Sequence, residues 1–238
     1  MNKQPQCIIA TEHGFKGHML DVCLSTGYYR MQHLMFTCND TQADGDGYNI
    51  PVFWLRTLLR QCQPQRTALT IQKKCSSFHV SIKRAAINAE VEDLYSLYRG
   101  HVPFNTSATC ESYLYQPEIP NPFESMMVEV RDGDKLVAIG YFDKGAEAIA
   151  GIMNIYHPQY QRYSLGKFLI LQKMQYAVLQ NMQYYYTGYI STGTTRFDYK
   201  TFPDPSAVEV FLPIEKKWVP YNWLGKEFLQ DYYFNYLV

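Results

Sequence analysis

Residues 148–190, AIAGIMNIYHPQYQRYSLGKFLILQKMQYAVLQNMQYYYTGYI, decide the fold of this chain. The run 148–156 predicts a strand, and the tyrosine-rich run 184–190 predicts another. Between them, a helix predicted from Ser164 to about Asn181 is apolar on most of its sides, so we expect it to be buried. The segment therefore predicts a strand, a turn, a buried helix and a second strand.

The turn within this segment, YQRYSLGKF at 160–168, combines a serine, a glycine and two cations. Ser164 suits the N-cap of the helix, and Gly166 lets the backbone approach a ligand closely. The first amide groups of a helix attract anions, and Arg162 and Lys167 would add positive charge. From these residues alone, a phosphate cradle and an ordinary capped helix start remain open. The spacing matches neither a Walker motif nor a dinucleotide-binding fingerprint.

The segments around this unit indicate a sheet. MMVEVR (126–131) and KLVAIGYFD (135–143) alternate on either side of Asp132-Gly133, which predicts a hairpin. AVEVFLP (207–213) and KKWVPY (216–221) predict one or two further strands. We therefore expect an α+β (α/β) fold in which the long helix packs across a mixed, mostly antiparallel sheet.

The N-terminal half predicts a smaller α+β region. Residues 50–62 are apolar and are expected to enter a short helix, whereas 67–72 and 77–83 predict strands. Asn88 is expected to cap a helix, and a further helix is expected over 107–115. QPEIPNP (116–122) holds three prolines in seven residues, which excludes regular structure. It predicts a boundary between an N-terminal region, 1–116, and a C-terminal domain, 117–238.

Composition narrows the classes of protein. The chain has 238 residues, of which 47% are hydrophobic and 18% charged, as in globular proteins. Its net charge is zero, so any nucleic acid must contact a local basic patch. The 21 tyrosines favour a partly wet cleft, because each hydroxyl needs a polar partner. The polar N-terminus, the lack of a membrane-length apolar run and six scattered cysteines predict a soluble, cytoplasmic protein with reduced thiols.

An ordered set of residues resembles the C-terminal domain of arginyl/leucyl-tRNA–protein transferases, most strongly over 140–205. In order, the matching residues are Pro158, Arg162, Ser164-Leu165-Gly166, Gly188-Tyr189, Tyr199-Lys200 and Pro203. The resemblance implies a fold like that of acetyltransferases of the GNAT type. In that fold the two strands that flank the helix splay apart and admit an acyl group.

Three departures from the family pattern stand out. Cys23 and Cys38 are too far apart for the paired cysteine motif of the family, so we predict no metal ligand. His157 stands where an acidic residue often precedes the proline, and the residues Thr-Arg-Phe-Asp at 195–198 replace Cys-Pro-Lys-Met.

The resemblance implies transfer of an aminoacyl group, arginine or leucine, from tRNA to the N-terminal amine of a protein that begins with an acidic residue. This reaction tags proteins in the N-degron pathway and needs no cofactor beyond the charged tRNA. No membrane partner is expected. The implied candidates are Asp198, Tyr189 and His157 for catalysis, Arg162, Ser164, Gly166, Lys167 and Lys200 for tRNA, Asn154, Tyr156 and Gly188 for the aminoacyl pocket, and Arg30 and Arg56 for the substrate N-terminus.

Two other functions remain open at this level. The first is an acyl-CoA-dependent N-acyltransferase of the GNAT type, which uses the same fold. The second is a module that binds a tRNA end or an N-degron without catalysis. The transferred residue depends on the pocket, because arginine needs a buried carboxylate and leucine needs an apolar surface.

Overall fold

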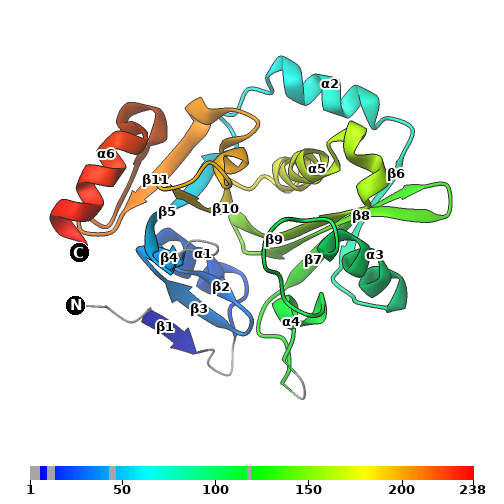
Figure 1. Cartoon of the computed structure of the whole chain (residues 1–238), viewed down its shortest axis with the longest axis horizontal. Coiled ribbons are helices and arrows are strands. Elements are labelled where there is room, and N and C mark those ends of the chain that lie inside the picture. Colours follow the sequence, from blue (N-terminus) through cyan, green and yellow to red (C-terminus); the bar gives the residue numbers. More distant parts are fainter. Residues whose placement is uncertain (1–5, 10–13, 43–46, 117–118) are drawn as a thin grey trace.

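A nine-stranded sheet forms the centre of the computed structural model, which describes residues 6–9, 14–42, 47–116 and 119–238 (Figure 1). Every neighbouring pair of its strands is antiparallel except β9 and β10. Across the sheet, the strands are β12 (Lys217–Pro220), β11 (Val208–Leu212), β5 (Asn49–Leu58), β10 (Tyr184–Ser191), β9 (Ala148–Tyr156), β8 (Lys135–Lys144), β7 (Ser125–Asp132) and β6 (His79–Arg84), with β4 (Asp40–Gln42) paired to β5.

The unit predicted from residues 148–190 is confirmed. β9 is followed by a short 3-10 helix, η1 (Pro158–Tyr163), then by helix α5 (Leu165–Leu179) and by β10. The hairpin is also confirmed, since Asp132 pairs with Lys135 across the turn between β7 and β8. The mixed, mostly antiparallel α+β class expected from the sequence is therefore correct.

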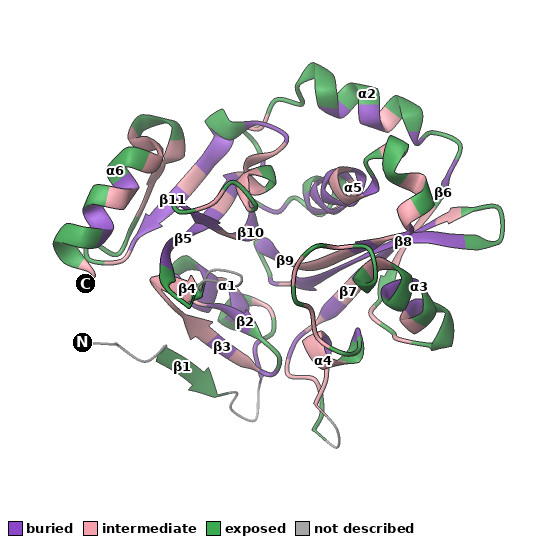
Figure 2. Cartoon of the chain, in the orientation of Figure 1, coloured by how far each residue is buried: buried purple, intermediate pink, exposed green. Residues whose placement is uncertain are grey.

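Helices cover both faces of the sheet (Figure 2). On one face, α5 and α2 (Arg66–Lys74) pack over side chains such as Ala138 and Phe142 of β8. On the other face, α3 (Ala89–Arg99) and α4 (Glu111–Leu114) pack over the alternate residues Ile139 and Tyr141. A strand that is buried on both faces has a nearly continuous apolar sequence. The sequence of β8 has this pattern because helices cover it from both sides.

The N-terminal segment and the C-terminal helix complete the structure. Helix α1 (His18–Ser25) and a small sheet of β1 (Gln6–Ile9), β3 (Leu34–Thr37) and β2 (Tyr29–Met31) pack with Trp54 and Tyr186. Helix α6 (Tyr221–Tyr236) packs against Phe53 and Leu55 of β5 and was not predicted from the sequence. Two more 3-10 helices, η2 (Asp198–Thr201) and η3 (Pro205–Ala207), lie between β10 and β11.

Two elements of the N-terminal half were predicted wrongly. Residues 49–58 form strand β5 between β10 and β11, where burial on both faces produces an apolar run that resembles a helix. Residues 66–74 form helix α2 and not a strand, because Ala68 and Ile71 lie three positions apart on one buried face. Strand β6 and the Asn88 cap of α3 are confirmed, since Asn88 Oδ1 accepts from the Val91 amide at 3.0 Å. The helix expected over 107–115 is limited to α4.

The boundary expected near residue 116 stays a prediction. Strands β5 and β6 come from the N-terminal side of it and lie in the same sheet as the strands from the C-terminal side. Residues 117 and 118 of the proline-rich stretch lie outside the described part of the chain.

The packing of α5 predicts where the fold is sensitive to truncation. Leu169 is fully buried under the sheet, so Leu169→Ala should lower the free energy of unfolding by about 2–5 kcal/mol. Leu179 ends the same helix and is 70% exposed, so Leu179→Ala is the matched control, with an expected change within about 0.5 kcal/mol. Urea unfolding followed by circular dichroism measures both, and equal losses would contradict the assigned burial of α5.

Candidate functional site

Strands β9 and β10 separate partway along their length. They run parallel and are joined by three residue pairs, from Ala148–Tyr184 to Ala150–Tyr186. Both strands are described to their ends at Tyr156 and Ser191, yet no further pair joins them. The separation of the two strands expected from the family resemblance is therefore present.

Each strand carries a β-bulge directly after the last shared pair. On β9 the extra residue is Ile152, because Tyr141 pairs with Met153 and Phe142 with Gly151. On β10 the extra residue is Thr187, and the following Gly188 has a φ of 97°, which favours glycine. Bulges bend strands and redirect side chains next to functional sites.

A buried tyrosine bridges the two strands where they part. The Tyr29 hydroxyl lies within hydrogen-bonding distance of the Gly151 carbonyl on β9 and 3.0 Å from the Tyr186 carbonyl on β10. Both carbonyls only accept and the hydroxyl has one hydrogen, so it donates to one of them at a time, at the point where the strands stop pairing with each other. Burial raises the pKa of Tyr29 well above its ordinary value, so the hydroxyl stays neutral.

A cavity of about 680 Å³ lies at the open end of the separated strands. Its walls come from α3 and the loop after it, from β9, from the start of α5 and from the loop after β10. The lining residues are Tyr95, Tyr98, His101, Val102, Pro103, Phe104, Thr106, Tyr113, Ile152, Met153, Asn154, Tyr156, Gln161, Ser164, Leu165, Gly166, Lys167, Arg196, Phe197 and Tyr199. Aromatic and aliphatic side chains predominate, and this set contains no carboxylate.

The structure brings five of the predicted site residues into this cavity. Asn154 and Tyr156 enter it from β9, and Ser164, Gly166 and Lys167 enter it from the start of α5. A larger hollow of about 1130 Å³, between β3, the β11–β12 turn and the end of α6, contains none of the predicted site residues.

The start of α5 differs from the capped helix that was expected. Ser164 occupies the N-cap position with a left-handed backbone, φ 54°, and its side chain makes no capping hydrogen bond within the described structure. Its carbonyl accepts from the Lys167 and Phe168 amides, both at 3.0 Å. The expected side-chain cap is therefore wrong. Among the described residues, no partner accepts a backbone hydrogen bond from the Leu165 or Gly166 amides, which begin the helix beside the cavity.

Gly166 permits close packing at this helix start. A Cβ atom at this position would lie 3.3 Å from Cε1 of Tyr156, closer than ordinary van der Waals contact. The glycine therefore lets the first turn of α5 lie against β9 and its aromatic side chain. This arrangement keeps the helix amides near the cavity.

Two cations line the cavity. The Lys167 ammonium lies 5.2 Å from the Phe202 ring centroid, and the Arg196 guanidinium lies 3.9 Å from that of Phe104. Arg196 was not among the residues predicted from the sequence, although its place in 195–198 was noted as a departure from the family pattern. Arg162 is exposed and stacks on Tyr163 outside the lining, with 4.8 Å between its guanidinium and the ring centroid.

Lys200 lies beside the separated strands but not in the cavity lining. Its ammonium lies 4.4 Å from the Tyr189 ring centroid and 4.8 Å from that of Phe197, and a Cβ at Gly188 would be 2.9 Å from its Nζ. Burial, with a smaller contribution from Arg196, lowers the pKa of Lys200 to about 7. Near pH 7 the amine is therefore about half protonated, so Lys200 carries less positive charge than an ordinary lysine.

None of the three predicted catalytic residues lines the cavity. The Asp198 carboxylate forms an ion pair with Lys226 of α6 at 2.6 Å. Tyr189 packs edge to face against Trp54 and Phe197. Their catalytic roles stay predictions, and their positions give those roles no support.

His157, the third of these residues, caps the 3-10 helix η1. Its Nδ1 accepts from the Gln159 amide at 3.3 Å, and its ring packs edge to face on Tyr160. Burial lowers the pKa of His157, with a smaller contribution from Lys135, so the ring is neutral near pH 7. These contacts explain why a histidine suits this corner, and its catalytic role stays a prediction.

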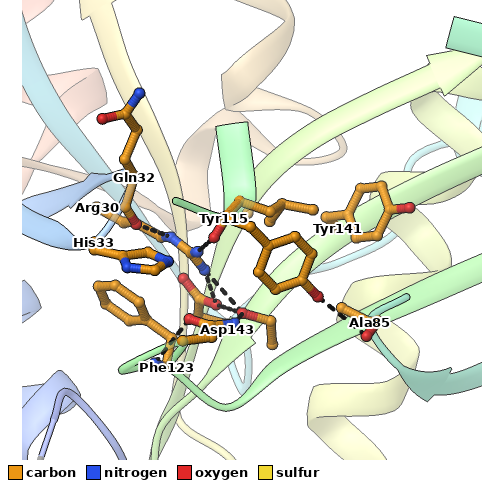
Figure 3. A network of polar contacts seen from close by, with 12 residues as sticks. Arg30, Gln32, His33, Ala85, Tyr115, Phe123, Tyr141 and Asp143 are labelled. Carbon is orange, nitrogen blue, oxygen red and sulfur yellow. Dashed lines mark hydrogen bonds and ion pairs between the residues drawn. The ribbon is translucent and has the colours of Figure 1, made fainter. Parts of the chain in front are cut away.

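Arg30 lies in a buried polar network (Figure 3). Its guanidinium bonds to Asp143 at 2.7 Å and to Ser125 at 2.8 Å, and it also donates to the carbonyls of Gln32 and Leu114. The Arg30 side chain is 1% exposed, so it has no surface on which a substrate carboxylate could bind. Arg30 was expected to bind the acidic N-terminus of the substrate, and its position gives that role no support. Its contacts are those of a structural ion pair.

Arg56 is also engaged within the protein. Its Nε donates to Glu209 at 2.7 Å, and its guanidinium lies between the rings of Tyr184 and Trp218, 4.3 Å and 4.6 Å from their centroids. The Arg56 side chain is 13% exposed and lies outside the cavity lining. Its role in substrate recognition stays a prediction without support from its position.

The cysteine thiols give no indication of a metal centre. Burial raises the pKa of Cys38 and Cys110 to about 12 and that of Cys75 to about 11, which disfavours the thiolates that metals bind. Within the described residues, no group of three or more His, Cys, Asp or Glu side chains is placed to hold a metal ion.

Among the helices in the described part of the chain, none is both long and apolar enough to cross a membrane.

The environment of Lys200 predicts an unusual titration. We expect the Lys200 Cε resonance to titrate near pH 7 by NMR, compared with about 10.4 for an ordinary lysine. Arg196→Met should raise this midpoint, because it removes a nearby positive charge. Lys200→Met assigns the resonance, and a Lys200 midpoint near pH 10 in the unmodified protein would contradict the assigned burial.

Comparison with known proteins identifies a family. The family model described as "Arginine-tRNA-protein transferase, C terminus" matches residues 90–209, about half of the chain. An aspartate/glutamate leucyltransferase of Leptospira interrogans is 25% identical over 169 residues, which cover 69% of this chain and 66% of the relative. The arginyl-tRNA–protein transferase 1 of Arabidopsis thaliana is 23% identical over 176 residues, which cover 63% of this chain and 27% of the plant protein.

Among solved structures, a GCN5-related N-acetyltransferase from Kribbella flavida is similar, with a TM-score of 0.35 and 12% identity over 72% of this chain and 54% of that one. A likeness this distant carries no functional conclusion.

The chain matches about two thirds of the length of the bacterial leucyltransferase and about a quarter of that of the plant protein. The match to the family model covers strands β7 to β10, with both separated strands, and the helices α4 and α5. The chain therefore belongs to the arginine-tRNA–protein transferase C-terminal family.

Proposed function

We propose that this protein transfers an aminoacyl group from charged tRNA to the N-terminal amine of a protein that begins with an acidic residue, and so tags it for the N-degron pathway. The observation that carries the proposal is the cavity at the open end of the separated strands. It combines the amide groups at the start of α5 and the cations Lys167 and Arg196 with an aromatic wall. Family membership and the names of the relatives support the same reaction class.

The polar part of the cavity suits the end of a tRNA. Helix amides and lysine or arginine side chains bind phosphate oxygens, and aromatic rings stack on unpaired bases. Lys167 and Arg196 supply the charge, and Tyr156, Phe104 and Phe197 are among the rings that line the same cavity. A neutral protein can bind nucleic acid through such a local patch.

The apolar part of the cavity supports leucine over arginine as the transferred residue. A buried guanidinium needs a carboxylate partner, and no Asp or Glu occurs among the lining residues. Ile152, Met153 and Val102 instead offer an apolar surface for an aliphatic side chain. Several relatives named as leucyltransferases are consistent with this proposal.

The reaction requires little chemistry from the protein. The amine nitrogen attacks the ester carbonyl carbon, so a C–N bond forms and the C–O bond to the tRNA ribose breaks. The amine loses a proton and the ribose oxygen gains one. An α-amine has a pKa of about 7.7–8.0, so part of it is nucleophilic at neutral pH. The ester is already activated, so placement of the two reactants can supply much of the rate, and no cofactor is expected.

The two alternatives predict different products. An acyl-CoA-dependent acyltransferase would place pyrophosphate at the start of α5, and a module without catalysis would bind tRNA but form no product. We expect leucine on an Asp-starting peptide when the protein is incubated with leucyl-tRNA, and little product with arginyl-tRNA. Mass spectrometry of the peptide reads the added residue. A product from acetyl-CoA but none from either charged tRNA would overturn the proposal, and an Ala-starting peptide tests the requirement for an acidic residue.

The cavity cations predict the salt dependence of tRNA binding. Lys167→Ala and Arg196→Ala should each weaken binding of charged tRNA and reduce the slope of log affinity against log salt by about 0.7–1. Lys74→Ala, at an exposed position at the end of α2, is the matched control and should change neither quantity. Fluorescence anisotropy at four salt concentrations measures the slope, and slopes that match the control would mean that the tRNA end lies elsewhere.

A further inference from the structure

One lysine is fully buried beneath the cavity. Lys173 is 1% exposed and lies on α5, where the neighbouring buried positions are apolar. A charged group so deep in a protein is costly unless hydrogen bonds satisfy it. Lys173 was not among the residues predicted from the sequence, although a lysine between buried apolar positions of a helix is a signal that could have identified it.

Three acceptors surround the Lys173 ammonium. Nζ donates to the Tyr141 carbonyl at 2.7 Å, to the Met153 carbonyl at 3.2 Å and to Asn154 Oδ1 at 2.8 Å. Burial lowers the pKa of Lys173 to about 7, against a smaller opposing effect of Asp143, and the three acceptors match the three N–H groups of the charged form. Tyr141 and Met153 are the residues paired across β8 and β9 directly beside the Ile152 bulge. Lys173 therefore reaches the sheet where β9 turns away from its neighbour.

A glycine makes room for this contact. A Cβ atom at Gly140 would lie 2.8 Å from Asn154 Oδ1 and 2.9 Å from Lys173 Cε. Any larger residue at this position on β8 would push the two side chains apart. The backbone of β8 is therefore adapted to the contact between Lys173 and Asn154.

The contact fixes the orientation of Asn154. The Gly166 carbonyl only accepts, so Asn154 Nδ2 faces it, and Asn154 Oδ1 then faces Lys173 Nζ, which donates to it. Nδ2 lies 3.4 Å from the Gly166 carbonyl, and Asn154 lines the cavity. The amide carries two N–H groups, and in the described structure Gly166 accepts from one of them. The second remains for a ligand.

On the basis of the proposed function, we propose that Asn154 donates a hydrogen bond to the ester carbonyl oxygen of the aminoacyl group and that Lys173 is the positioning residue that holds Asn154 in this orientation. The carbonyl oxygen gains negative charge when the substrate amine forms its C–N bond, and it loses that charge when the C–O bond to the ribose breaks. A fixed N–H donor stabilises this charge without reorganising during the reaction. Lys173 itself stays behind Asn154 and touches no substrate.

The first variants remove the donor. Asn154→Asp keeps the shape and can still accept from Lys173, but it has no N–H group to offer. We expect kcat to fall by about 10²–10³-fold, as for loss of one oxyanion donor. Asn154→Ala, which adds no charge to the cavity, should show a similar loss, and the Kd for charged tRNA should change much less than kcat. A kcat within twofold of the unmodified protein in both variants would overturn the proposal.

The second set of variants separates positioning from mere stability. Lys173→Met should lower kcat by about 10- to 100-fold, because Asn154 is no longer held in one orientation. In the Asn154→Ala background, Lys173→Met should lower kcat only slightly further, because no side-chain amide is left to position. An equal loss in both backgrounds would show that Lys173 only stabilises the fold. Lys74→Met, at an exposed position, is the matched control and should keep full activity.

These measurements distinguish the two proposals. If the unmodified protein transfers leucine but the Asn154 variants keep their kcat, the role of Asn154 fails and the proposed function stands. If the unmodified protein transfers nothing, the proposed function fails. In that case NMR of the Asn154 side-chain amide in Lys173→Met still tests whether Lys173 holds its orientation, and an unchanged amide signal would overturn that part. Should Lys173→Met fail to fold, the Asn154 variants alone decide.

Discussion

The rest of this structure depends on the separation of β9 and β10 after three shared residue pairs. Two adjacent parallel strands that part leave backbone groups without their usual partners, and these groups must be satisfied if they are buried. The Tyr29 hydroxyl can donate to either of two carbonyls, one on each strand, and Lys173 Nζ donates to two carbonyls at the β8–β9 bulge. The opening that forms the cavity is therefore held by side chains from distant parts of the chain.

The buried side chains of Arg30 and Lys173 show how a polar group can shape a site without contact with a ligand. Arg30 ties β2 to β8 through Asp143, and Lys173 ties α5 to β9 through Asn154. Removing one partner of such a contact leaves a charge or a polar atom unsatisfied in the interior, which is costly. The cavity cations Lys167 and Arg196 differ, because they reach the lining itself. The buried residues can therefore only maintain the structure around the cavity, whereas the residues of the lining can contact a substrate.

Much of the fold followed from local patterns. The hairpin of β7 and β8, strand β9, helix α5 and strand β10 were predicted because their periodicity and turn residues are local properties. The segment of β5 was misread because a strand buried on both faces has the composition of a buried helix, and its place between β10 and β11 depends on residues 126 or more positions away. The site was predicted in part, since Asn154, Tyr156, Ser164, Gly166 and Lys167 meet in one cavity.

The sequence by itself determined the strand–turn–helix–strand unit, the burial of α5 and the resemblance that family membership confirms. Only the tertiary structure decided which polar side chains face the cavity. Arg30 and Asp143 are 113 positions apart, and their ion pair withdraws from the surface an arginine whose local sequence suggested a role in recognition. Asn154 acquires its orientation from Lys173, which lies 19 positions away on a different element. The environment of a side chain is set by the contacts that folding creates, and local sequence patterns do not encode these contacts.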